Sequence, residues 1–180
     1  TLSKQTDSPA GALEAAAAIQ LLRNQSLEEA LPLVVEEVGI YIGASKVLLY
    51  LTDPEYRRPE NDKGWKLSGV WAAEKADKTV GWEESRMLSS FYHALYSNRQ
   101  TQSIEISSNS GNEVLAGFLD VLGVSSLLVV PFSADEATEG LLLVGTPLRS
   151  EEAILADLEA AAEMIGSAVG QHRTIHKLTQ

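Results

Sequence analysis

The sequence predicts an α+β domain in which helices flank an antiparallel β-sheet. Its 180 residues are the length of one domain with a sizeable core. Helical and strand patterns follow one another as two helices, two or three strands, two helices, a strand hairpin and one helix. Few of the connections are long enough for repeated parallel crossovers, and this favours antiparallel pairing.

Two helices are expected at the N-terminal end. The segment 11–23 is rich in alanine and leucine, which are strong helix formers. Ser26 and Glu29 have the spacing of a capping box, and apolar residues then recur every three or four positions as far as residue 42. Gly43 suits the end of this second helix because glycine readily adopts a left-handed conformation.

The middle of the chain predicts strands separated by polar loops. The segments 46–52 and 65–73 carry the valine, leucine and aromatic side chains that are typical of strands. The charged segment 53–64 contains two prolines and is expected to be a loop. A short third strand is expected near Val80, and another over residues 102–107.

The chain from residue 85 onward predicts a hairpin and three helices. The apolar runs 124–132 and 140–145 form the hairpin, and the acidic segment 135–139 is its loop. Gly123 ends the helix that precedes this hairpin. The residues expected to begin the three helices are Ser85, Asn112 and Ser150.

The composition excludes several classes of chemistry. No cysteine is present, which excludes disulfides, thiolate zinc sites, iron–sulfur clusters, a cysteine nucleophile and any cofactor linked through cysteine. A net charge of −11 argues against nucleic acid as a partner. No apolar run has the roughly 18 residues of a membrane span, and no secretory signal is found, so we expect a cytoplasmic protein. The chain begins at Thr1 rather than at Met, so we expect a fragment of a longer protein or a processed form.

No catalytic motif is found either. The sequence lacks a G-x-S-x-G elbow, a glycine-rich phosphate loop and an H-E-x-x-H pair. The numerous carboxylates fall mostly in patterns typical of solvated helix faces and loops. We therefore predict that the domain is not an enzyme.

One stretch resembles a known family. The residues from Leu122 to Phe132, LGVSSLLVVPF, and the strand from Glu139 to Gly145, EGLLLVG, resemble the hallmark of the GAF domain. The similarity covers roughly residues 26–170. It implies a GAF- or PAS-like antiparallel sheet of about six strands, with helices on both sides and the N- and C-terminal helices packed together. It also implies a regulatory role, because GAF domains sense small ligands or hold dimers together in signalling proteins.

Two departures from the family pattern restrict the classes of ligand that the domain is expected to bind. Cyclic-nucleotide-binding members carry an N-K-x-n-F-x-x-x-D-E motif, and no segment here matches it. Bilin-binding members attach their pigment through a cysteine, which this chain lacks. The sulfoxide-reductase branch of the family is excluded for the same reason. The cofactor is therefore left unknown.

Aromatic residues between positions 65 and 96 predict an apolar ligand pocket. In the family layout this region includes a central strand, a loop and the helix that roofs the pocket. The alternative is that these rings fill the core without binding a ligand. His93 lies in the same region, but a single histidine without a visible partner does not favour haem ligation. The residues predicted to line the pocket are Trp71, Trp82, Phe91, Tyr92, Tyr96 and Phe118.

The last helix carries a heptad pattern that predicts a dimer. A second apolar line runs beside the first at seven-residue spacing, so one line can face the sheet and the other a partner helix. The alternative is a single wide face buried within the domain. His172 and His176 also share a face of this helix, but no third ligand is near in sequence and a metal site is disfavoured. The predicted dimer contacts are Ile154, Leu158, Ala161, Ile165 and Ala168.

These observations combine into one functional prediction. Residues 1–10 are expected to be a disordered tail or one added for expression, 11–170 a single domain, and 171–180 a helical extension toward a downstream domain. The chain is predicted to be a non-enzymatic module that senses a small molecule and signals through dimeric terminal helices. A fused or separate signalling output domain is the expected partner. The alternative is a ligand-free scaffold for dimerisation or protein contact.

Overall fold

The computed structural model describes residues 12–23, 26–59, 63–74, 88, 102–105, 113–145 and 152–179. The third strand expected near Val80 lies outside these residues. The helix expected after Ser85 does too, apart from Leu88, which is helical and buried. The helices are α2 (Ala12–Arg23), α3 (Leu27–Ile42), the 3₁₀ turn η1 (Pro54–Tyr56), α5 (Glu113–Leu122) and α6 (Glu152–Thr179). The strands are β1 (Lys46–Thr52), β2 (Trp65–Ala72), β3 (Gln102–Glu105), β4 (Ser126–Asp135) and β5 (Thr138–Gly145).

The strands form one antiparallel sheet in the order β2-β1-β5-β4-β3. The predicted antiparallel pairing is confirmed. Five strands lie in the described part of the chain, against about six expected. Every residue of the inner strand β1 is buried, because both faces of the sheet are covered. This explains why its sequence, KVLLYLT, is apolar at consecutive positions.

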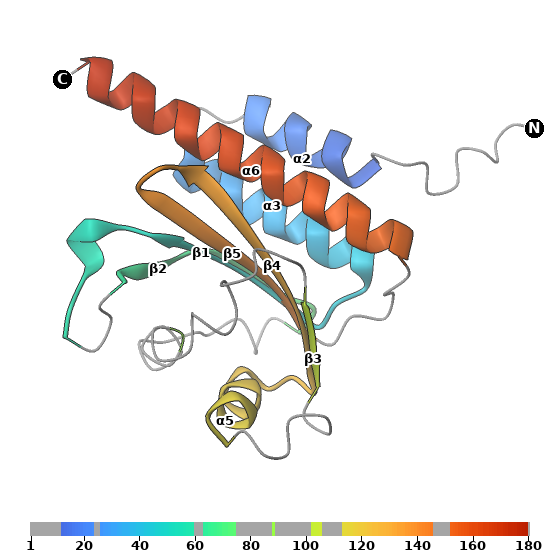
Figure 1. The fold of residues 1–180 in the computed structure, drawn as a ribbon. Coiled ribbons are helices and arrows are strands. Elements are labelled where there is room, and N and C mark those ends of the chain that lie inside the picture. The colour runs from blue at the N-terminus through green and yellow to red at the C-terminus, as the bar shows by residue number, and fades with distance from the viewer. Residues whose placement is uncertain are drawn as a thin grey trace, which may run out of the picture.

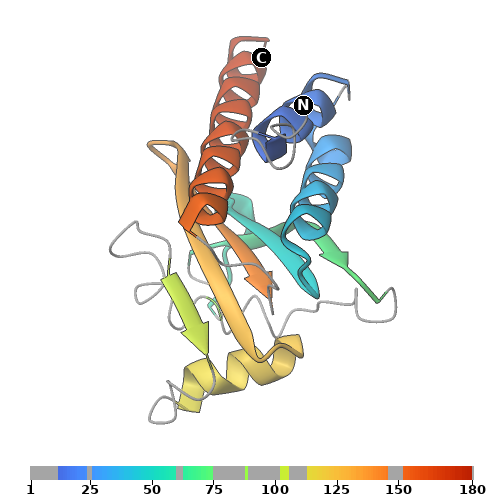
Figure 2. The same ribbon diagram turned by 90° about the vertical axis from the view of Figure 1, so that its right-hand side faces the viewer.

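Helices cover both faces of the sheet, as predicted. Figures 1 and 2 show α3 and α6 on one face, with α2 beside them, and α5 on the other. We call these the α6 face and the α5 face. Leu13 and Ala17 of α2 are buried in the same core as α6, so the N-terminal and C-terminal helices pack together as expected. Two apolar cores result, one on each face.

The predicted ends of α3 are confirmed. The Ser26 hydroxyl accepts a hydrogen bond from the backbone N–H of Glu29 at 3.3 Å. Gly43 has a φ of 72°, and its N–H donates to the carbonyl of Gly39 at 2.9 Å. These short-range contacts are specified within four residues of sequence, which is why the pattern predicted them correctly.

The hairpin between β4 and β5 is tighter than predicted. The strands extend to Asp135 and resume at Thr138, which leaves a turn of only Glu136 and Ala137. The Asp135 carboxylate accepts a hydrogen bond from the N–H of Ala137 at 2.8 Å and closes this turn. The expected loop over 135–139 was therefore wrong, because these polar residues continue the ladder beyond the apolar core.

A β-bulge interrupts β2 and sets which face each of its side chains covers. Leu49 of β1 pairs with Gly69, but the next residue, Tyr50, pairs with Leu67, so Ser68 is an extra residue in β2. Trp65 and Trp71 are six positions apart and would share a face in a regular strand. The bulge places Trp65 in the core of the α5 face and Trp71 against the core of the α6 face.

Candidate functional site

A cluster of buried aromatic side chains occupies the α5 face. Tyr50 of β1, Trp65 of β2 and Phe118 of α5 are fully buried there, among leucine and valine side chains. Leu88 joins the same core. Tyr and Trp bring a hydroxyl and an indole N–H into this apolar environment. An apolar region with a few polar groups is the usual composition of a small-molecule site.

Of the six predicted pocket residues, the structure describes two and separates them. Phe118 lies in the core of the α5 face. Trp71 lies on the α6 face, where a Cβ built on Gly39 of α3 would overlap its ring. These two residues do not line one pocket, because the bulge reverses the faces of β2 between Trp65 and Trp71. The other four, Trp82, Phe91, Tyr92 and Tyr96, lie outside the described residues, as does His93.

Two aromatic residues of the α5 face were absent from the predicted site. Tyr50 could have been found from strand alternation, since it shares a face with Leu48. The sequence could not show that Trp65 and Trp71 lie on opposite faces of the sheet, because nothing in it marks Ser68 as the bulged residue. Gly69 offers a weak signal, since glycine inside a strand often accompanies a bulge.

The predicted dimer contacts of α6 lie inside the chain's own core. Ile154, Leu158, Ala161 and Ile165 are buried in the core of the α6 face, and Ala168 is half-buried. The second apolar line is also covered: Ala162 and Val169 are buried, and Leu155 packs against the same core. A helix lying on a sheet beside two other helices buries a wide stripe. The alternative of a single wide face within the domain accounts for the four buried residues, whereas the half-buried Ala168 keeps part of its surface exposed.

A buried lysine connects β1 to α5. The Lys46 side chain is only 7% exposed, and its Nζ donates a hydrogen bond to the carbonyl of Leu122 at 3.0 Å. Leu122 is the last residue of α5, so the ammonium group lies at the negative end of the helix dipole. Lys46 thereby fixes the C-terminal end of the helix that covers the aromatic cluster.

Lys46→Met is expected to lower the free energy of unfolding by about 1–3 kcal/mol, because the Leu122 carbonyl loses its donor while the apolar stem is kept. Urea denaturation measures this loss. Lys66→Met changes an exposed lysine on the neighbouring strand and should stay within about 0.5 kcal/mol of the parent. Equal losses in the two variants would contradict the role of the Lys46 hydrogen bond.

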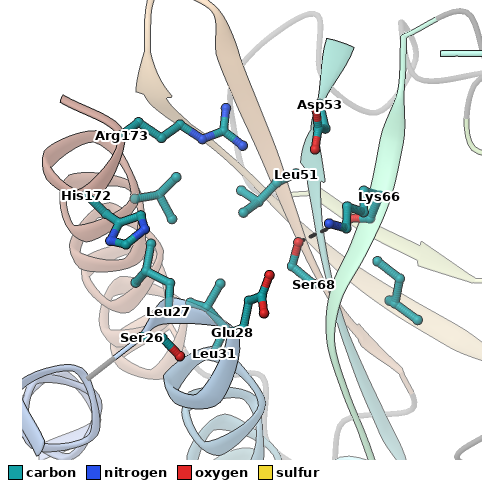
Figure 3. A pocket seen from close by; sticks show the side chains of 12 residues that line it. Ser26, Leu27, Glu28, Leu31, Leu51, Asp53, Lys66, Ser68, His172 and Arg173 are labelled. Carbon is teal, nitrogen blue, oxygen red and sulfur yellow. Dashed lines mark hydrogen bonds between the residues drawn. The ribbon is translucent and has the colours of Figure 1, made fainter. Parts of the chain in front are cut away.

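An open cleft of about 530 Å³ lies on the α6 face. Figure 3 shows its walls, which come from the first turns of α3, the strands β1 and β2, and the C-terminal half of α6. Charged side chains from all three regions border the cleft, including Glu28, Lys66 and Arg173. No sequence pattern predicted this cleft, because these residues are far apart in the chain. His172, disfavoured as a metal ligand from its sequence, also borders it, and its side chain is exposed.

Arg173 also connects α6 to the β4–β5 hairpin. Its Nη1 donates to the hydroxyl of Thr138, a fully buried residue at the start of β5. Burial alone would raise the pKa of Asp135, but hydrogen bonds from Ala137 and Thr138, together with the charge of Arg173, hold this pKa below its usual value. The hairpin tip and the C-terminal half of α6 are thus joined by a charged hydrogen-bond cluster.

The described residues contain neither a membrane-spanning helix nor a cluster of metal ligands. None of their helices is both long and apolar enough to cross a membrane. Within the same part of the chain, no three histidine, aspartate or glutamate side chains come together in a group that could hold a metal ion.

Comparisons with known proteins identify a family for this fold. The family model of the GAF domain matches residues 26–171. No curated protein matches the sequence. Many solved structures do match, among them GAF domains that are 14–18% identical to this chain, and similarity at this level concerns the fold alone.

Three solved structures illustrate this similarity. The phycoerythrobilin-bound GAF domain of a cyanobacterial phytochrome is 14% identical with a TM-score of 0.67, over 98% of this chain and 99% of that one. The GAF domain of a putative sensor histidine kinase from Pseudomonas syringae pv. tomato is 14% identical with a TM-score of 0.62, over 97% and 96%. The GAF domain of an Acinetobacter phosphoenolpyruvate-protein phosphotransferase is 16% identical with a TM-score of 0.63, over 92% and 94%.

Proposed function

Because this chain belongs to the GAF domain family, we propose that it is a non-catalytic module that senses a small molecule for a signal-transduction protein. The family match supports a sensory or regulatory role. The similar structures support it further, since they are GAF domains of a phytochrome, a sensor kinase and a phosphotransferase. A fused or separate output domain is the partner that such a role requires, and the predicted cytoplasmic location is compatible with it.

The ligand is proposed to bind on the α5 face. The observation that carries this proposal is the buried cluster of Tyr50, Trp65 and Phe118, which places the Tyr50 hydroxyl and the Trp65 indole N–H in an apolar core beneath α5. The predicted contacts Trp82, Phe91, Tyr92 and Tyr96 remain part of the proposal. Although one similar structure is bound to phycoerythrobilin, this chain has no cysteine, so attachment of a pigment through cysteine is excluded.

The signal is proposed to leave through α6. This helix packs against β4, whose hairpin partner β5 lies beside β1, and it continues unbroken to Thr179. A change on the α5 face can therefore reach α6 through the sheet. Dimerisation through the terminal helices stays a prediction, and its interface must avoid the buried residues Ile154, Leu158, Ala161 and Ile165.

A ligand-free scaffold is the second candidate. The complete burial of Tyr50, Trp65 and Phe118 favours it, since well-packed rings can serve the core alone. The two candidates differ in whether any small molecule stabilises the folded chain.

A thermal-shift screen separates the two candidates. A ligand that binds only the folded state stabilises it by about 2.7 kcal/mol at a hundred times its Kd. We expect at least one compound among nucleotides, free tetrapyrroles, amino acids and small acids to raise the Tm reproducibly. An unchanged Tm across the whole panel would favour the scaffold instead.

A further inference from the structure

The cleft on the α6 face is a second candidate site, separated from the aromatic cluster by the sheet. Its volume of about 530 Å³ lies within the range of small-molecule sites. Leu27, Leu31, Leu51 and Val169 give it an apolar floor. Binding in this cleft does not require a ligand on the α5 face.

The bulge in β2 forms part of the cleft wall. Ser68, the extra residue, borders the cleft, and its hydroxyl donates to the carbonyl of Lys66 at 3.3 Å. Figure 3 shows the Ser68 side chain directed into the cavity from the strand, opposite Glu28 of α3. Bulges are common next to binding sites because they redirect side chains. Here the bulge keeps Lys66 on the α6 face while Trp65 and Leu67 pack on the other face.

Charges of both signs border the same cavity. Lys66 and Arg173 are the cations, and they come from β2 and α6. Glu28 and Asp53 are the anions; Glu28 comes from the first turn of α3, and Asp53 directly follows β1. Asp53 is fixed in place, since its carboxylate accepts a hydrogen bond from the N–H of Glu55 at 3.0 Å. Figure 3 shows the Glu28 carboxylate directed toward the centre of the cavity.

We propose that this cleft binds a small zwitterion with an aliphatic body, of the size of an amino acid. The carboxylate of the ligand lies toward Lys66 and Arg173, and its ammonium group lies toward Glu28. A simple anion would face repulsion from Glu28 and Asp53, and a simple cation would face repulsion from Lys66 and Arg173. The leucine and valine floor fits an aliphatic side chain and offers no partner to a polar one.

The ligand would act on α6 directly. Arg173 borders the cleft and donates to Thr138 at the hairpin, so a carboxylate in the cleft competes for the side chain that joins α6 to β5. A ligand in the cleft would therefore change the contacts of α6 independently of any ligand on the α5 face.

Isothermal titration calorimetry on the full chain tests the proposal with three probes of similar shape. These are leucine, 4-methylpentanoate, which lacks the amine, and isopentylamine, which lacks the carboxylate. Leucine should bind about tenfold more tightly than either analogue, because each analogue loses one charged contact. Lys66→Gln should weaken the binding of leucine and 4-methylpentanoate about tenfold but leave that of isopentylamine unweakened. Glu28→Gln should weaken leucine and isopentylamine about tenfold but leave 4-methylpentanoate unweakened.

Glu36→Gln is the matched control, because Glu36 is an exposed carboxylate on the same helix outside the cleft. It should bind leucine like the parent. Three results would overturn the proposal: no binding of leucine at millimolar concentrations, equal binding of 4-methylpentanoate and leucine, or binding that neither Lys66→Gln nor Glu28→Gln weakens. The last result would place the ligand elsewhere, so it leaves the proposed role of the α5 face standing.

Discussion

Ile165→Glu is expected to unfold the domain rather than to separate a dimer. The Ile165 side chain is 0% exposed and lies in the core where α6 meets the sheet. A carboxylate at this position is buried without a partner, which costs about 4–5 kcal/mol or more, a large part of the stability of an ordinary domain. Loss of near-UV circular dichroism and of a cooperative denaturation transition would record the unfolding.

Ser167→Glu is the matched control, because Ser167 is exposed on the same helix two residues later. This variant should remain within about 0.5 kcal/mol of the parent. Ile165→Val keeps an apolar side chain and should cost only about 0.5–1.5 kcal/mol. An Ile165→Glu protein that stays folded but changes from dimer to monomer would contradict this expectation and would show that the heptad residues form a dimer interface.

Trp65→Ala is expected to have the second-largest effect. The Trp65 side chain is 0% exposed and lies in the core of the α5 face, among apolar side chains of β1 and α5. Removing a large aromatic side chain from a core costs about 3–5 kcal/mol, so we expect a loss of this size in guanidinium denaturation.

Deletion of Ser68 is the matched comparison, because it removes the bulge but keeps Leu67 opposite Tyr50 and Gly69 opposite Leu49. Trp65 is then five positions from Trp71 in a regular strand, so the two side chains stay on opposite faces. The deletion should therefore cost less than Trp65→Ala, and Ser68→Ala should change the free energy of unfolding by no more than about 0.5 kcal/mol. A deletion variant as unstable as Trp65→Ala would contradict this account of the pairing.

Elements specified by local contacts could be predicted from the sequence, and features that depend on distant packing could not. The strand Lys46–Thr52 and the capped helix that ends at Gly43 follow from patterns within a few residues. The heptad pattern of α6 is the same for a helix on its own sheet as for a helix on a partner, so it could not identify the contact. Only the structure shows that Ile154 and Ile165 are covered by the chain itself.

In the candidate site, too, the features that the sequence did not predict depend on how distant residues pack together. A single inserted residue, Ser68, reverses the face of Trp71 relative to Trp65, and periodicity does not reveal an insertion of one residue. The charged cleft depends on Glu28, Lys66 and Arg173 meeting across three elements. Their spacing in the chain carries no signal, because tertiary packing alone brings them together.

Ligand binding on the α5 face is tested most directly by comparing Trp65→Phe with Trp71→Phe. Both variants make the same chemical change in β2, but the two side chains lie on opposite faces of the sheet. For a compound that raises the Tm of the parent, the shift is measured against each variant's own ligand-free Tm. The shift should shrink strongly in Trp65→Phe and persist in Trp71→Phe. Retention of the full shift in Trp65→Phe, with loss in Trp71→Phe, would contradict a ligand on the α5 face.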